Sequence, residues 1–253
     1  MATLERDRMP PIDDGAWRPV LSMRWQHLLF VHWRVPPETL RPLIPEPLQI
    51  DTYGGYAWVG FVPFVMTYVR PVWLPAIPKL FDFPEANIRA YVRYGEQRGV
   101  WFFSLDAAHR FGVWIARRFW KLPYHYARIH WHKPAHDQIL YETHRRGRRP
   151  AYARVRYVIE GTPEETRPDT LEHFLVERYT LFTVYHNELY RAEVAHLPYA
   201  IQPARILELE QTLTDAAGIP ITEAPASVFY APGFGVLASG LQHLSVASPM
   251  HPR

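Results

Sequence analysis

The segment from Phe83 to Asp106, FPEANIRAYVRYGEQRGVWFFSLD, constrains the fold more than any other part of the chain. Polar and apolar residues alternate in its first half, with Glu85, Asn87, Arg89 and Tyr91 in one set and Ala86, Ile88, Ala90 and Val92 in the other. Successive side chains of a strand point to opposite faces, so this pattern predicts a strand with one polar face. A turn at residues 95–99 leads into an apolar run at residues 100–105, which is typical of a fully buried strand.

The polar face of the first strand has two interpretations. It is either the wet side of a sheet edge or the wall of a pocket inside a barrel. The alternation alone favours the wet edge, because antiparallel strands with one solvated face are common.

The composition indicates a strand-rich protein with one domain. Aromatic residues make up 15% of the 253 residues, and 25 prolines suit many rigid turns. No linker, repeat or charge shift divides the chain, so we expect a flexible tail at residues 1–20 and a single domain at residues 21–245.

Further elements follow from hydrophobic pattern and turn residues. Strands are predicted at Arg24–Trp33, Leu48–Asp51, Ala57–Val69, Tyr126–Trp131, Ile139–His144, Tyr152–Glu160, Tyr179–Tyr185, Leu189–His196 and Gly235–Ser239. One helix is predicted at Ala107–Trp120. A second begins at the capping-box spacing of residues 169–172 and ends near Glu177. The segment from Ala204 is ambiguous between strand and helix, with a helix stop at Gly218.

Several classes of protein are disfavoured by what the sequence lacks. The absence of cysteine excludes a disulfide framework, a thiol nucleophile and a zinc-thiolate site, and it favours a reducing cytoplasm. A net charge of +3 is too modest to indicate nucleic acid as a partner. The N-terminal residues lack the apolar core of a secretory signal, and the longest apolar stretch, Tyr56–Val69, is too short and interrupted to cross a bilayer as a helix. We therefore expect a soluble cytoplasmic protein without a membrane partner.

Two basic clusters have a functional and a structural interpretation. Four arginines at residues 145–149 could bind phosphate, but without interleaved aromatic residues a solvated hairpin tip is favoured. His130 and His132 lie on one face of a predicted strand and could bind a metal. No carboxylate stands at a suitable offset, so no metal site is expected. No P-loop or serine-hydrolase elbow is present either, and no cofactor is expected.

Lys121 follows a predicted helix that carries Arg117 and Arg118. Nearby cations lower the pKa of an amine, and a neutral lysine can attack a carbonyl to form a Schiff base. The alternative is a lysine that complements the dipole at the end of the helix, and the residues alone favour it.

Four segments carry a resemblance to a known family. HLLFVHWRVPPETLRPLIPEPLQIDTYGGYAWVGFVPF, FPEANIRAYV, GVWFFSLDA and ARRFWKLPYHYARI resemble the uncharacterised bacterial YqjF-like proteins, within the acetoacetate decarboxylase-like superfamily. The resemblance is close from Arg24 to Trp131 and looser beyond. It implies a mainly β (α+β) fold, a cone-like antiparallel β-barrel with a few flanking helices, whose central cavity the polar residues of the opening strand would face.

The resemblance also implies site residues. A pocket glutamate of acetoacetate decarboxylases is similar in position to Glu85, and the segment of their Schiff-base lysine resembles residues 119–124, which include Lys121. The tandem lysines of that segment are reduced to one. A second pocket glutamate is missing, because its expected position falls in the apolar run at residues 58–66.

Three functions remain open at this stage. The first is a lyase-type enzyme acting on a small oxo acid, with Glu85 and Lys121 as catalytic residues and Asn87, Arg89 and Tyr91 binding the substrate. The second is a small-ligand-binding protein without catalysis, in which Glu85 and Arg89 form a structural pair. The third is a homo-oligomerisation domain that uses the aromatic residues of Val72–Phe83.

Overall fold

The computed structural model describes residues 18–77 and 81–244. Of the predicted tail at residues 1–20, residues 1–17 lie outside this range, and the first strand already begins at Pro19. Part of the predicted subunit contact, residues 78–80, also lies outside it. Trp73, Leu74 and Ile77 of that segment are exposed.

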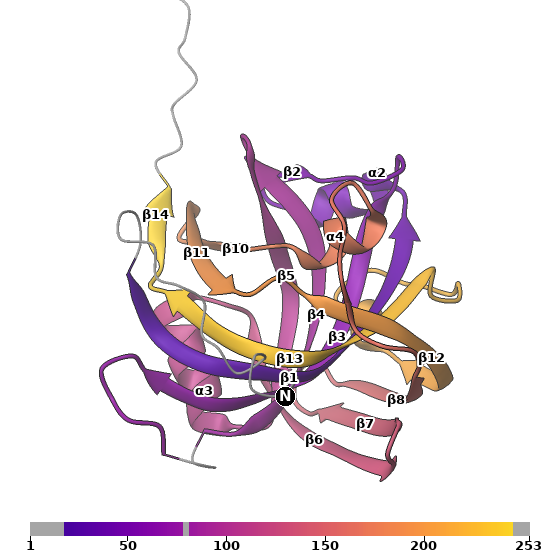
Figure 1. The fold of residues 1–253 in the computed structure, drawn as a ribbon. Helices are drawn as coiled ribbons and strands as arrows, with labels where there is room; N and C mark the ends of the chain where they lie inside the picture. The colour runs from indigo at the N-terminus through magenta and orange to yellow at the C-terminus, as the bar shows by residue number, and fades with distance from the viewer. Residues whose placement is uncertain (1–17, 78–80, 245–253) are drawn as a thin grey trace, which may run out of the picture.

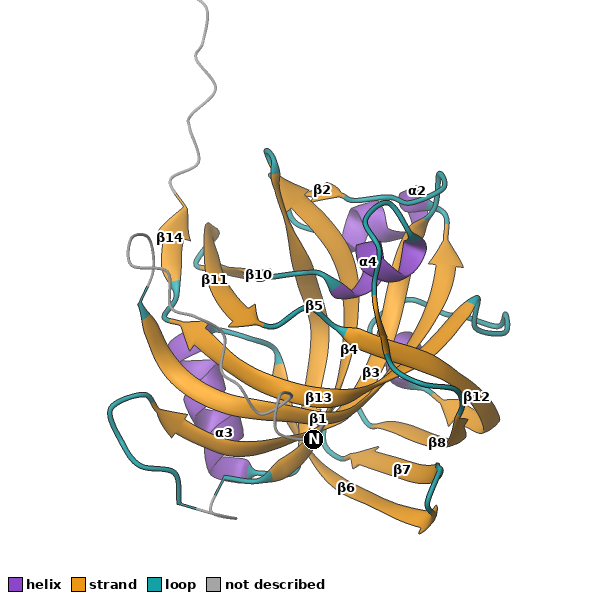
Figure 2. Cartoon of the chain, in the orientation of Figure 1, coloured by secondary structure: helices purple, strands orange, loops and turns teal. Residues whose placement is uncertain are grey.

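Strands dominate the chain, and the few helices are short and peripheral (Figure 2). The strands of the described part are β1 (Pro19–Val35), β2 (Gln49–Ile50), β3 (Ala57–Pro71), β4 (Phe83–Tyr94), β5 (Gln97–Ala107), β6 (Tyr124–Ala135), β7 (Gln138–Arg145), β8 (Ala151–Ile159), β9 (Glu164–Glu165), β10 (Thr180–Tyr185), β11 (Glu188–His196), β12 (Ala200–Gln211), β13 (Ser227–Ser239) and β14 (Gln242–Leu244). The helices are α2 (Pro37–Leu40), the 3-10 turn η1 (Arg41–Leu43), α3 (Arg110–Ile115), the π-helical turn η2 (Ala116–Trp120), α4 (Leu171–Val176) and α5 (Leu213–Ala216).

The strands close into a barrel (Figure 1). Nine of them form a ring in the order β5-β6-β7-β8-β12-β13-β1-β3-β4, which the pairing of β4 with β5 closes. A second, seven-strand ring runs β13-β1-β3-β4-β5-β10-β11 and is closed by the pairing of β11 with β13. Nearly all pairings are antiparallel, with β5–β6 and β5–β10 parallel. The expected mainly antiparallel barrel with a few flanking helices is confirmed.

The alternation along β4 divides the core into two clusters. Ala86, Ile88 and Ala90 belong to a cluster with residues of β6, β7 and β8, such as Tyr157. Tyr91, from the other set, belongs to a cluster with residues of α3 and α4. Because successive side chains of a strand point to opposite faces, β4 is a wall between these two cores.

The predicted long helix at Ala107–Trp120 is only partly correct. β5 continues to Ala107, and α3 begins after His109, whose imidazole accepts a hydrogen bond from the Gly112 amide at 2.9 Å. The expected apolar stripe lies largely outside the core, since Phe111 and Phe119 are exposed. The ambiguous segment from Ala204 is resolved as part of β12 followed by α5, and Gly218 follows α5 with a φ of 82°.

Candidate functional site

The four polar residues of β4 lie inside the protein. Glu85 is 2% exposed and Arg89 8% exposed, and Asn87 and Tyr91 are also buried. β3 and β5 pair with β4 on its two sides, and α4 covers its polar face, where the Leu175 carbonyl accepts hydrogen bonds from both Arg89 and Tyr91. The interpretation of this face as a wet sheet edge is therefore wrong.

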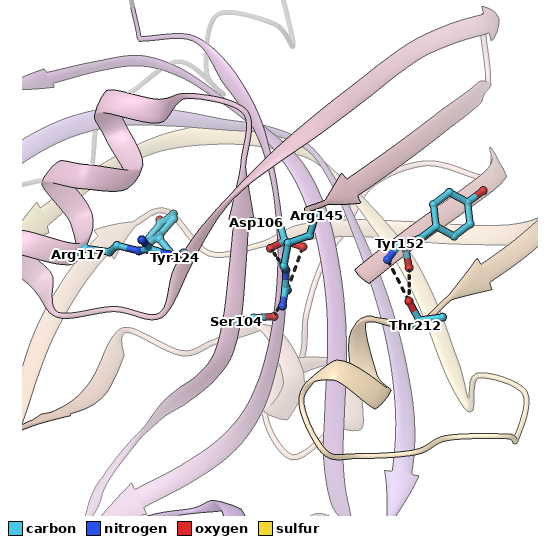
Figure 3. Close-up of polar contacts among 7 residues, drawn as sticks. All are labelled: Ser104, Asp106, Arg117, Tyr124, Arg145, Tyr152 and Thr212. Atoms are coloured by element: carbon cyan, nitrogen blue, oxygen red, sulfur yellow. Dashed lines mark hydrogen bonds and ion pairs between the residues drawn. The ribbon is translucent and has the colours of Figure 1, made fainter. Parts of the chain in front are cut away.

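Glu85 is paired with a tyrosine. The Tyr124 hydroxyl, from the first residue of β6, donates a hydrogen bond of 2.9 Å to the Glu85 carboxyl. Burial raises the pKa of Glu85 to about 8; the bond from Tyr124 partly offsets this, and the charge of Asp106 adds to it. Arg117 holds the tyrosine backbone in place by donating to its carbonyl at 2.6 Å (Figure 3). At neutral pH Glu85 is mainly a neutral acid that can give up a proton.

Arg89 is a buried cation without a counter-ion. One of its terminal nitrogens donates to the Leu175 carbonyl at 3.2 Å, and the guanidinium lies over the rings of Phe30 and Tyr91. It makes no ion pair with any residue in the described ranges. Its Nε, also buried, has no hydrogen-bond partner there.

Other buried atoms on this side of β4 also lack partners in the described part of the chain. Among them are the Asn87 Oδ1 and the His32 Nδ1. The other ring nitrogen of His32 is 2.7 Å from the Tyr91 hydroxyl. Burial, followed by the charge of Arg89, lowers the pKa of His32 well below its usual value, so the imidazole is neutral. A buried polar atom without a hydrogen-bond partner lowers the stability of the folded protein. Several such atoms on one face of a strand indicate a binding site for a polar ligand.

The predicted structural pair of Glu85 and Arg89 is not formed. Glu85 bonds with Tyr124, whereas Arg89 bonds with the backbone of α4. The two residues are four positions apart on an extended strand, a distance that their side chains do not bridge.

Lys121 lies apart from these residues. It ends η2 in the left-handed conformation with a φ of 55°, and its Nζ donates to the Arg118 carbonyl at 2.6 Å. The amine also lies 4.4 Å above the Tyr185 ring. Within residues 119–124, the side chain that contacts Glu85 is that of Tyr124. Sequence reasoning missed this tyrosine because the parallel pairing of β6 with β5 leaves no short-range signal.

The prediction that the arginines of residues 145–149 lie at a solvated hairpin tip is wrong for Arg145. It is the last residue of β7 and is 4% exposed, so it does not lie at the solvated tip. Its guanidinium donates to both oxygens of Asp106, at 2.7 and 3.0 Å, and to the Ser104 hydroxyl at 2.9 Å (Figure 3). Asp106 pairs with Ala86 across the sheet, so this cluster lies on the other face of β4 and β5 from Glu85.

No group of three or more histidine, aspartate or glutamate side chains is arranged to hold a metal within residues 18–77 and 81–244. His130 and His132 lie exposed on β6. None of the helices in these ranges is long and apolar enough to cross a membrane.

Comparison with known proteins places this geometry in context. The pattern of the DUF2071 family, described as an uncharacterized conserved protein, matches residues 22–235. The uncharacterized protein YqjF of Bacillus subtilis is 40% identical over 220 residues, which cover 87% of this chain and 90% of that protein. Both findings agree with the resemblance seen in the sequence.

The fold is shared with solved enzymes at low sequence identity. The enduracididine biosynthesis enzyme MppR, complexed with pyruvate, is 14% identical with a TM-score of 0.63, covering 92% of this chain and 93% of its own. The acetoacetate decarboxylase of Legionella pneumophila is 15% identical with a TM-score of 0.60, covering 95% and 94%. The acetoacetate decarboxylase-like fold is therefore confirmed.

Proposed function

Because this chain belongs to the DUF2071 family and has an acetoacetate decarboxylase-like fold, we propose that it binds a small carboxylated molecule against Arg89, inside the seven-strand ring. The observation that carries this proposal is the uncompensated charge of Arg89. Removing a guanidinium from water without a counter-ion costs several kcal/mol, and a bound carboxylate offsets that cost. The planar guanidinium also matches a carboxylate in geometry.

The neighbouring polar atoms suit a carbonyl compound. Asn87, which lies between Glu85 and Arg89 on the strand, has a free amide oxygen for a hydroxyl or an amine of the ligand. The protonated carboxyl of Glu85 is able to donate a proton to a carbonyl oxygen or a carbanion. The neighbour MppR, whose structure holds pyruvate, supports a small oxo acid as the class of ligand.

Two outcomes for the bound molecule follow. A lyase-type reaction, of decarboxylase, aldolase or dehydratase type, would use Glu85 for proton transfer and would require the Lys121 amine to leave the Arg118 carbonyl and reach the ligand to form an imine. Binding without catalysis is the second candidate. It is favoured by the Lys121 amine, which bonds with the Arg118 carbonyl and contacts none of the other predicted site residues.

Thermal unfolding with a series of 2-oxo acids, beginning with pyruvate, tests the binding site. A bound ligand raises the melting temperature in proportion to the logarithm of its concentration. We expect this shift in the wild type and in Arg93→Gln, an exposed arginine of the same strand, and its loss in Arg89→Gln. No shift with any 2-oxo acid, or an equal shift in Arg89→Gln, would contradict the proposal.

Borohydride trapping then separates the two outcomes. Reduction of an imine fixes the oxo acid to an amine and adds its mass to one peptide. An adduct that is lost in Lys121→Ala supports the imine reaction. A thermal shift without any adduct supports binding without an imine.

A further inference from the structure

We propose that the chain has a second ligand site, a cavity of about 320 Å³ between β5, β6 and β10, which takes a small carboxylate with a flat apolar body. Its lining comes from distant parts of the chain: Leu43, Trp101, Phe102, Phe103, Lys121, Pro123, His125, Arg145, Arg149, Phe182, Thr183, Val184, Ala216 and Ala217. None of Glu85, Asn87 and Arg89 is among them. This site is thus distinct from the one proposed above.

The charge of the lining has one sign. Lys121, Arg145 and Arg149 are cationic, His125 is basic, and no aspartate or glutamate lines the cavity. The charge of Arg145 is neutralised by its ion pair with Asp106. Lys121 and Arg149, however, make no ion pair with any residue of the described chain. Two cationic residues without a carboxylate partner therefore line one small cavity, and their combined potential attracts an anion.

The pKa of His125, which also lines the cavity, is affected by the same positive charges. Burial, and then the charges of Arg145, Arg117 and Arg149, lower the pKa of His125 to about 4. The imidazole is therefore neutral at pH 7, with one nitrogen able to donate a hydrogen bond. A carboxylate in the cavity would oppose the arginines and favour the protonated ring.

The rest of the lining selects the body of the ligand. Trp101, Phe103 and Phe182 supply aromatic surface, and Leu43 of η1 and Ala216 of α5 add aliphatic surface. Flat rings stack well on aromatic side chains. The volume is at the small end of the range for ligand cavities, which suits a single ring with a carboxylate. An inorganic anion would leave this apolar surface without a contact.

Lys121 has a role in this site that does not need an imine. The Thr183 hydroxyl of β10 donates to the Lys121 carbonyl at 2.9 Å and so fixes the residue at the cavity. Its left-handed φ of 55° is a sparsely populated conformation for a residue with a side chain. Such strain is commonly kept where it positions a functional group, and here it places Lys121 in the lining of the cavity.

Benzoate is the probe, with benzamide as its uncharged analogue, and calorimetric titration measures the dissociation constant. We expect benzoate to bind and benzamide to bind at least about tenfold more weakly, the usual contribution of a hydrogen bond to a charged group. Arg149→Gln should raise the dissociation constant of benzoate by about the same factor. Arg146→Gln, an exposed arginine of the same connection that does not line the cavity, should leave it unchanged.

Histidine NMR locates the bound molecule. Saturating benzoate should raise the pKa of His125 by about one unit, with the resonance assigned by its loss in His125→Gln. Arg89→Gln should keep both the affinity and this shift, so failure of the site at Arg89 would not affect the result. The inference is overturned if benzoate does not bind, if benzamide binds equally well, or if Arg149→Gln and Arg146→Gln behave alike while both remain folded by circular dichroism.

Discussion

The Tyr124 hydroxyl donates a hydrogen bond of 2.9 Å to the carboxyl of Glu85, and this bond joins the start of β6 to the polar face of β4. The two residues are 39 positions apart in the chain. Glu85 is buried and Tyr124 is partly buried, so the bond is largely shielded from water. This pair gives the interior of the barrel a group that titrates near neutral pH.

Glu85 should make stability depend on pH. Its pKa is 4.5 when exposed and about 8 in the folded protein, so the folded state binds an extra proton between these values. The contribution of Glu85 to the free energy of unfolding is greatest below pH 4.5. It decreases by about 1.4 kcal/mol per pH unit from there up to pH 8. Urea unfolding from pH 4.5 to 9 should show this slope in the difference between the wild type and Glu85→Gln. Glu96→Gln, an exposed glutamate in the turn after β4, is the control, and an identical slope in Glu85→Gln contradicts the prediction.

Tyr124→Phe removes the hydroxyl and leaves the ring in place. The bond from Tyr124 lowers the pKa of Glu85, so its loss should raise that pKa further and extend the falling part of the pH profile above pH 8. The free energy of unfolding at pH 7 should drop by about 1 kcal/mol. The same pH series of urea unfolding measures both effects. Tyr94→Phe, at the end of the same strand, is the matched control, and a Tyr124→Phe profile that matches it would show that the bond has no influence on Glu85.

The strand pattern was predictable from sequence, but its burial was not. The alternation of polar and apolar residues depends only on neighbours in the sequence, so it was enough to place Glu85 and Arg89 on one face of β4. What covers that face is α4, at residues 171–176, and no local pattern links this helix to the strand. Pattern therefore favoured a wet edge, and only the family resemblance favoured an interior face.

The same limit applies at Arg145 and at Lys121. Arg145 stands among four neighbouring arginines, and only its pairing with Ala127 and Ala151 fixes it as a strand residue that faces Asp106. Lys121 follows a helix-like segment, and η2 ends there in a left-handed turn that no local pattern in the sequence indicates. The residue that reaches Glu85 is fixed by a parallel strand pair, which depends on tertiary structure.

Arg145→Met should be strongly destabilising. It leaves Asp106 buried without its partner, and breaking a buried ion pair on one side typically costs about 3–5 kcal/mol. The double variant Arg145→Met with Asp106→Leu should recover most of this loss, because no buried charge remains. Urea unfolding at pH 7 measures both, with Arg146→Met as an exposed control expected within about 0.5 kcal/mol of wild type. A loss in Arg145→Met as small as that of the control would mean that the pair is not formed.

Arg89→Met should have the opposite effect from Arg145→Met, although both replace a buried arginine. Arg89 has no carboxylate partner in the described chain, so methionine removes an uncompensated charge and fills the space beside Phe30 and Tyr91. The Leu175 carbonyl keeps its bond from the Tyr91 hydroxyl at 2.9 Å, so no acceptor is left unsatisfied. Without ligand, we expect Arg89→Met to gain about 1–3 kcal/mol in urea unfolding and to lose any stabilisation by 2-oxo acids. Arg93→Met on the same strand should change neither, and a destabilised Arg89→Met would show that this guanidinium serves the fold.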